Sequence, residues 1–143
     1  MLLKDALVVY TYLREQYADH DIILYGRSLG TGIATYLATI HSPNMLVLET
    51  PYMSMKELAL RQFPFVPPML LKYPLQTARW ISAVACPVYL LHGTRDEVIP
   101  YDSSERLIPL IRSQHQLFSI PDGGHNNLVA FPEYRAALDQ ILL

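Results

Sequence analysis

The segment Gly26-Arg27-Ser28-Leu29-Gly30 is the feature that most constrains the fold of this sequence. It follows the apolar run 22–25 and precedes a stretch with helical periodicity, so the serine stands at a sharp turn from strand to helix. Such a turn holds the serine in a strained backbone conformation and displays its hydroxyl. We expect both glycines to be required, because a Cβ at either position would strike the neighbouring strand or helix. Ser28 is therefore a candidate nucleophile.

Two later apolar runs lead into the other side chains that a nucleophilic serine needs. The run 88–91 precedes Asp96, and the run 116–120 precedes His125. The carboxyl ends of parallel strands meet at one edge of a sheet, so we expect Ser28, Asp96 and His125 to gather there. The histidine would take the serine proton, and the carboxylate would orient the histidine. Neighbouring Glu97 is interpreted as a solvated side chain and Asp122 as a turn residue.

The chain order Ser, Asp, His is typical of the α/β-hydrolase fold and differs from that of chymotrypsin or subtilisin. The sequence resembles this superfamily, and within it the serine hydrolases related to BEM46-like and ABHD-type proteins. The segments 26–32, 48–52, 92–100 and 123–126 carry the resemblance, which extends over nearly the whole chain. It implies a small-molecule carboxylic ester or thioester as substrate and an acyl-enzyme intermediate. It also implies the backbone N–H of Leu29 as one oxyanion donor.

The resemblance also indicates what lies upstream in a complete domain of this kind. There the turn follows the fifth of eight strands, whereas only 25 residues precede Gly26. The chain therefore corresponds to the C-terminal half of such a domain, as a fragment, a truncated gene product or a naturally shortened form. The loop that normally supplies the second oxyanion donor would precede it. Loss of one donor typically slows turnover by about 10²–10³, so we expect weak or no activity from this chain.

The pattern of apolar residues predicts alternating helices and strands. Leu3, Leu7, Tyr10, Leu13 and Tyr17 recur at helical spacing near the start of the chain. Helices are predicted over 2–17, 29–41, 102–112 and 131–142, and strands over 22–25, 45–49, 88–92 and 115–120. This alternation predicts one α/β domain over residues 1–143, a three-layer sandwich with a mostly parallel sheet of about four strands.

Residues 51–86 interrupt the alternation. The segment is rich in proline and contains Phe63, Phe65, Met69 and Trp80. One interpretation is a cap or lid whose side chains wall a substrate pocket above Ser28, with these four residues in contact with the acyl group. The alternative is a set of loops and short helices that pack on the body of the domain.

Composition excludes several classes of function. A formal charge of −2 with 17% charged residues does not suggest a nucleic-acid surface. No apolar stretch reaches the roughly 18 residues of a membrane span, so a cytoplasmic location is favoured, although an anchor upstream stays open. The histidines outside the proposed site lack metal-ligand spacing and are interpreted as surface or strand-end residues: His20, His41, His92 and His115. No metal or cofactor is expected.

The sequence leaves two possible roles for each of two charged residues, and two hypotheses for the function of the chain. Arg27 would pair with an acidic group of the body or reach the substrate, and Glu49 would orient nearby loops or simply end its strand. The first hypothesis is a serine hydrolase. The second is a non-catalytic or partner-dependent module that associates through the open sheet edge at residues 22–25.

Overall fold

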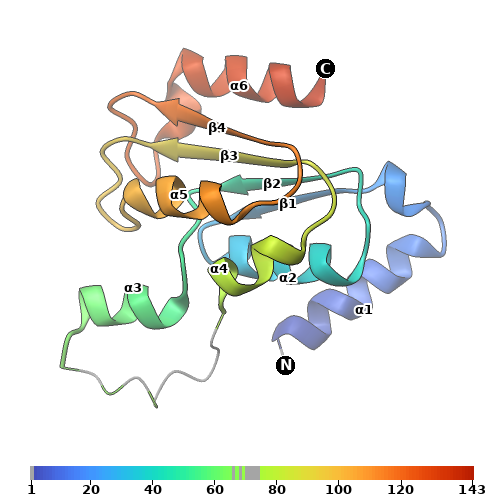
Figure 1. The fold of residues 1–143 in the computed structure, drawn as a ribbon. Helices are drawn as coiled ribbons and strands as arrows, with labels where there is room; N and C mark the ends of the chain where they lie inside the picture. The colour runs from blue at the N-terminus through green and yellow to red at the C-terminus, as the bar shows by residue number, and fades with distance from the viewer. Residues whose placement is uncertain (1, 66, 68, 70–74) are drawn as a thin grey trace.

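Four parallel strands form the centre of the protein. The computed structural model describes residues 2–65, 67, 69 and 75–143. The strands lie in the order in which they occur in the chain (Figure 1): β1 (Ile23–Arg27), β2 (Met45–Glu49), β3 (Val88–Gly93) and β4 (His115–Ile120). All four therefore end at the same edge of the sheet. The predicted α/β class and the four-stranded parallel sheet are confirmed.

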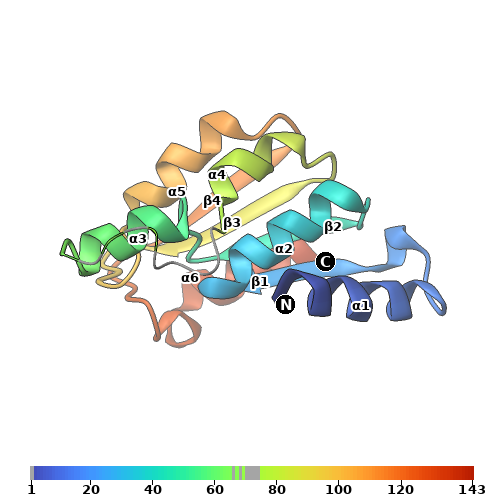
Figure 2. The ribbon, with the colours of Figure 1, turned by 90° about the horizontal axis from the view of Figure 1, so that it is seen from below.

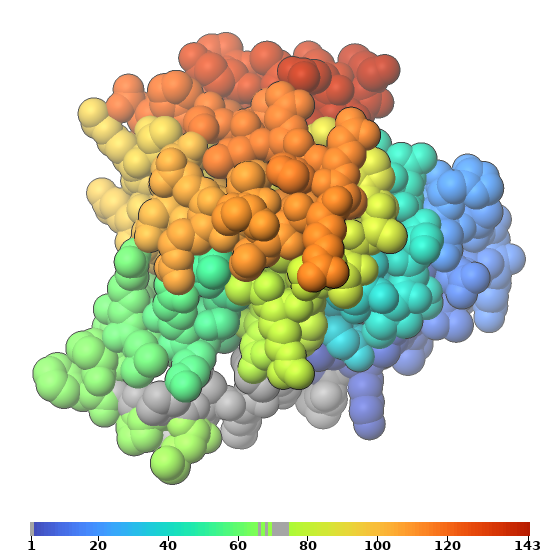
Figure 3. All heavy atoms as spheres, in the orientation of Figure 1, coloured from blue at the N-terminus to red at the C-terminus, as the bar shows by residue number. Residues whose placement is uncertain are grey.

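Helices cover both faces of this sheet (Figures 1 and 2). One face carries α2 (Leu29–Ile40), α4 (Thr77–Trp80) and α5 (Asp102–Leu107), with α1 (Leu2–Arg14) beside α2. The other face carries α6 (Pro132–Leu142). In the space-filling view the atoms of α4 and those of the α5 segment lie side by side on the outer surface of this layer (Figure 3). The remaining described helices are α3 (Met55–Gln62) and the 3₁₀ turns Asp19–Asp21, Ile81–Ala83, Ile108–Leu110 and Leu128–Ala130.

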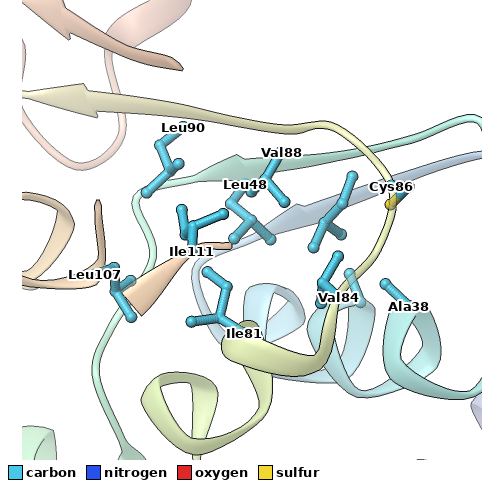
Figure 4. Close-up of a cluster of buried hydrophobic side chains, with 11 residues drawn as sticks. Ala38, Leu48, Ile81, Val84, Cys86, Val88, Leu90, Leu107 and Ile111 are labelled. Carbon is cyan, nitrogen blue, oxygen red and sulfur yellow. The ribbon is translucent and has the colours of Figure 1, made fainter. Parts of the chain in front are cut away.

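The larger apolar core lies between the sheet and the layer of α2, α4 and α5 (Figure 4). Leu48, Val88 and Leu90 point into it from the strands, and Leu107 and Ile111 close it on the α5 side. The near-continuous apolar strands fit a sheet that is covered on both faces. A smaller cluster on the opposite face joins the sheet to α6 through Val47, Leu91, Ala137 and Ile141.

The segment 51–86 divides into two parts. Ile81, Val84 and Cys86 belong to the main core, so the end of the segment is part of the body of the domain. Its start forms α3, which begins where the Ser54 hydroxyl accepts a hydrogen bond of 3.1 Å from the Glu57 backbone N–H. A cap role for the first part stays a prediction. Residues 66, 68 and 70–74 of the predicted cap lie outside the described residues.

Three elements differ from their predicted bounds by two residues or more. The first helix ends at Arg14 rather than at residue 17, and Tyr17 is exposed instead of packing with the helix. Arg14 Nε lies 2.7 Å from Asp19 Oδ1 where the chain turns toward β1. The α5 helix ends at Leu107, and Pro109, which lacks a backbone N–H, lies in the 3₁₀ turn that follows. The strand predicted over 22–25 extends over Ile23–Arg27.

β1 lies at one edge of the sheet. It pairs with β2 on one side, and among the described residues no strand pairs with its other side. Ile23 and Tyr25 are 43% and 45% exposed, because α6 covers the strands further along the sheet. No helix in the described part of the chain is both long enough and apolar enough to cross a membrane.

Candidate active site

The nucleophile turn lies between β1 and α2. Ser28 has φ 50° and ψ −118°, in the region of backbone space that L-residues rarely adopt. Its N–H donates a hydrogen bond of 2.9 Å to the carbonyl of Glu49, at the end of the neighbouring strand. This bond fixes the turn on the sheet. The side chain of Ser28 is thereby displayed at the edge where all four strands end.

One of the two flanking glycines is required by close packing. A Cβ on Gly26 would lie 2.6 Å from the Gly30 carbonyl oxygen and 2.8 Å from the Thr31 Cα, both too close for a real contact. Gly26 therefore lets α2 cross directly over the end of β1. The expectation for Gly30 is wrong, because a Cβ at that position would meet no atom within 4 Å.

The structure brings Ser28, His125 and Asp96 into one hydrogen-bonded row. His125 Nε2 lies 3.0 Å from Ser28 Oγ, and His125 Nδ1 lies 2.8 Å from Asp96 Oδ2. The loops after β3 and β4 carry Asp96 and His125 to the same edge of the sheet as the nucleophile turn (Figure 1). The imidazole thus lies between a hydroxyl and a carboxylate, the arrangement in which it can take a proton from the serine.

The carboxylate of Asp96 is fully buried and receives hydrogen bonds on both oxygens. Oδ1 accepts bonds of 2.9 and 2.8 Å from the N–H groups of Val98 and Ile99. Oδ2 faces His125 Nδ1 and, at 3.3 Å, His92 Nε2. Burial alone would raise the pKa of Asp96, but the bonds from His92, His125, Ile99 and Val98 together lower it from 3.8 to about 2. Asp96 is therefore ionised at neutral pH.

His92 is the residue near this site whose contacts the sequence does not reveal. It lies near the end of a strand, as expected, and its side chain is completely buried. Two signals in the sequence point to it: it continues the apolar run of β3, and it precedes Asp96 by four residues. Neither signal reveals which atoms the imidazole contacts.

Arg27 and Glu49 join the ends of β1 and β2 to the loop after β4 that carries His125 (the histidine loop). Arg27 Nε lies 3.1 Å from Glu49 Oε1, which confirms the predicted pairing with an acidic group of the body. A guanidinium nitrogen of Arg27 also donates to the carbonyl oxygen of His125 at 3.3 Å and to Asn126 Oδ1 at 3.2 Å. The Arg27 side chain therefore connects the strand before the nucleophile with the loop that carries the histidine.

Two tyrosines hold the other oxygen of Glu49. The hydroxyl groups of Tyr25 and Tyr134 both donate to Oε2, the second at 3.0 Å. Burial and these hydrogen bonds raise the pKa of Tyr25 well above its usual range. Glu49 is thus a buried carboxylate with three partners, consistent with the prediction that it orients neighbouring segments.

Leu29 is placed as an oxyanion donor requires. It is the first residue of α2, so its N–H has no acceptor within the helix and lies at the positive end of the helix dipole. It also follows Ser28 directly. Its role as an oxyanion donor stays a prediction.

Two hollows flank the histidine loop. One, of about 420 Å³, is lined mainly by polar side chains around His125, including Arg95, Glu97, Asp122, Asn126 and Asn127. The other, of about 430 Å³, lies over Arg27 and Glu49 and is bounded by α6. Glu97 is exposed, and Asp122 has φ 61° in a turn where it pairs with Arg95, so both were interpreted correctly.

The four predicted substrate-contacting residues do not line these hollows. Phe63, Phe65 and Met69 are exposed, and their contact with substrate stays a prediction. The ring of Trp80 packs against that of Tyr36, with 5.1 Å between centroids, and contact of Trp80 with substrate also stays a prediction.

Among the described residues, no group of three His, Cys, Asp or Glu side chains is arranged to hold a metal ion. The fold is that of part of an α/β-hydrolase domain, and the curated proteins that the chain resembles include an α/β-hydrolase domain-containing protein and a lipase. No protein-family model matches the chain.

Similar proteins agree with this assignment. The chain is 32% identical to the uncharacterized protein Rv2307c of Mycobacterium tuberculosis over 132 residues, which cover 88% of this chain and 46% of the relative. It is 27% identical to the lysophosphatidylserine lipase ABHD12 of Danio rerio over 80% of this chain and 35% of the relative. An esterase of Pyrococcus furiosus superposes with a TM-score of 0.72 at 16% identity, covering 93% of this chain and 58% of the esterase.

These relationships support a hydrolase function in general terms. The chain spans between about a third and a half of the length of the curated relatives it matches. The likeness to the solved esterase concerns the fold alone. A function for this chain therefore has to rest on the geometry of its own site.

Proposed function

We propose that this chain carries a serine hydrolase site that cleaves carboxylic ester or thioester bonds through an acyl-enzyme intermediate on Ser28. The row Ser28 Oγ, His125 and Asp96, with separations of 3.0 and 2.8 Å, is the observation that carries the proposal. The strained backbone of Ser28 supports it, because such conformations persist where the surrounding structure holds a reacting group in place.

In this mechanism the imidazole of His125 accepts a proton and gives it back in each of the two halves of the reaction. As Ser28 Oγ attacks the acyl carbon, its proton passes to Nε2, and the carbonyl oxygen becomes an oxyanion. The tetrahedral intermediate collapses, the alcohol or thiol leaves with the proton from Nε2, and the acyl group stays on Ser28. Water then attacks the acyl group, gives a proton to Nε2 and releases the acid. The proton finally returns to Ser28.

Asp96 and Leu29 stabilise the charges that develop in these steps. The buried carboxylate of Asp96 keeps a proton on Nδ1 and stabilises the imidazolium. The N–H of Leu29 donates to the oxyanion. With one assigned donor we expect slow turnover, since loss of a single donor typically costs about 10²–10³ in rate. The curated lipase relative supports an ester as the bond cleaved.

Active-site labelling with a fluorophosphonate probe tests this proposal. We expect the purified chain to be labelled at Ser28 and to hydrolyse p-nitrophenyl acetate slowly. Ser28→Ala and His125→Ala should abolish both signals, because they remove the nucleophile and its base. Ser82→Ala is the matched control, since Ser82 lies in the 3₁₀ turn after α4. A folded chain that is not labelled, or labelling that survives Ser28→Ala, would contradict the proposal.

A second function rests on the edge strand. The exposed side chains of Ile23 and Tyr25 and the unpaired side of β1 in the described structure favour association with another chain. Such association is compatible with catalysis. It becomes the main function only if the labelling experiment fails.

A further inference from the structure

His92 is buried directly behind the carboxylate of the site. It lies at the end of β3, and its side chain has no exposed surface. Three groups surround the ring nitrogens: the Ser104 hydroxyl at 2.7 Å from Nδ1, and the Ile99 carbonyl at 2.9 Å and Asp96 Oδ2 at 3.3 Å from Nε2. The mechanism proposed above does not use this histidine.

The partners of His92 determine which nitrogen of the neutral ring carries its proton. A carbonyl oxygen can only accept a hydrogen bond, so the nitrogen beside Ile99 must be the donor. Nε2 is therefore protonated. Nδ1 then accepts a hydrogen bond from the hydroxyl of Ser104, which can donate. The Ile99 carbonyl thus sets the tautomer in which Nε2–H faces Asp96, and the Ser104 hydroxyl donates to the nitrogen that is left without a proton.

The Nε2–H of His92 reaches the same carboxylate oxygen that faces His125. Asp96 Oδ2 lies 3.3 Å from His92 Nε2 and 2.8 Å from His125 Nδ1, while Oδ1 is occupied by two backbone N–H groups. Each carboxylate oxygen of Asp96 therefore has two nitrogen atoms within 3.3 Å. A carboxylate held in this way cannot rotate without losing hydrogen bonds.

We infer that His92 is a positioning residue that fixes the Asp96 carboxylate so that Oδ2 stays directed at His125. The inference rests on the proposed function, since it assigns His92 a task in the same site. It explains why a polar ring is buried in an apolar strand: a buried polar group needs its hydrogen bonds, and this one shares its single proton between a carbonyl and Asp96.

Two amide substitutions distinguish the contribution of the contact with Asp96 from that of the contact with Ser104. In His92→Gln the amide nitrogen reaches the position of Nε2 and keeps a donor beside Asp96. In His92→Asn the side chain is one methylene shorter, and its amide reaches only the position of Nδ1, beside Ser104. We expect labelling of Ser28 by the fluorophosphonate probe to be about tenfold slower in His92→Asn and within about threefold of the original rate in His92→Gln.

Nuclear magnetic resonance gives a readout that does not depend on catalysis. In His92→Asn we expect the Nδ1–H proton of His125 to exchange faster with water at neutral pH, because its acceptor is less firmly held. The His92→Gln chain should retain slow exchange. Equal labelling rates and equal exchange in two folded variants would overturn the inference. If the unsubstituted chain is not labelled but the exchange rates differ as expected, the positioning role stands and the proposed catalysis fails.

A measurement on unsubstituted protein covers the case in which neither variant folds. ¹⁵N spectra should show His92 as the Nε2–H tautomer at neutral pH, and Ser104→Ala should shift the Nδ1 signal, because Nδ1 loses its donor, while Nε2 keeps its proton beside the Ile99 carbonyl. Ser103→Ala is the matched control, since Ser103 is the preceding buried serine of α5. An Nδ1–H tautomer of His92 in the unsubstituted chain would overturn the inference.

Discussion

Gly26 and Gly30 flank the same serine but have different surroundings. We expect Gly26→Ala to lower the free energy of unfolding by about 1–3 kcal/mol, because its Cβ would lie 2.6 Å from a backbone oxygen that cannot move freely. Gly30→Ala is the matched control. It lies in the first turn of α2 with open space, so alanine should leave stability unchanged or raise it by up to about 1 kcal/mol. Urea denaturation measures both, and equal losses would contradict the packing argument.

At the residue scale, the sequence located the three side chains of the row but not their support. Ser28, Asp96 and His125 each follow a predicted strand, and the rule that parallel strands end at one edge brings them together. His92 could not be placed in this way. Its burial depends on α5, which packs Ser104 against the ring, and this contact is not encoded in the local pattern around residue 92.

At the element scale, the Arg27–Glu49 pair connects β1, β2, α6 and the histidine loop. Arg27→Met would leave the buried Glu49 carboxylate without its cation, and we expect a loss of about 1–2 kcal/mol because Arg27 itself is half exposed. The double variant Arg27→Met/Glu49→Gln should lose less than the sum of the single variants, since no unpaired charge remains. Thermal and urea unfolding of the four proteins give this coupling. Strict additivity would show that the pair does not act as a unit.

Strand boundaries were predicted better than the elements between them. The bounds of β2 and β4 agree with the prediction, and β2 is buried along nearly its whole length. The sequence leaves the segment 51–86 open between a cap and packing on the body, and at its end Ile81, Val84 and Cys86 belong to the main core. A proline-rich apolar stretch has the same composition in a cap and in a core. Tertiary packing alone distinguishes the two.

At the scale of the whole molecule, the uncovered edge at β1 should govern association. We expect the chain to self-associate with increasing concentration, and Ile23→Lys to reduce this, since a charge on an edge strand opposes pairing. Leu60→Lys is the matched control, because Leu60 is exposed on α3. Sedimentation velocity across a range of concentrations measures the effect. A chain that stays monomeric at all concentrations would contradict the expectation.

The order of the strands also bears on how the chain folds. Two neighbouring parallel strands cannot be joined by a hairpin, so each pair is connected by a longer crossover segment. The three crossovers are residues 28–44, 50–87 and 94–114. The longest of these separates β2 from β3, and longer loops cost more entropy to close, so we expect this pairing to form last. Ser28 precedes the crossover between β2 and β3 in the chain, whereas Asp96 and His125 follow it. Reactivity of the serine would therefore arise only in the final step of folding.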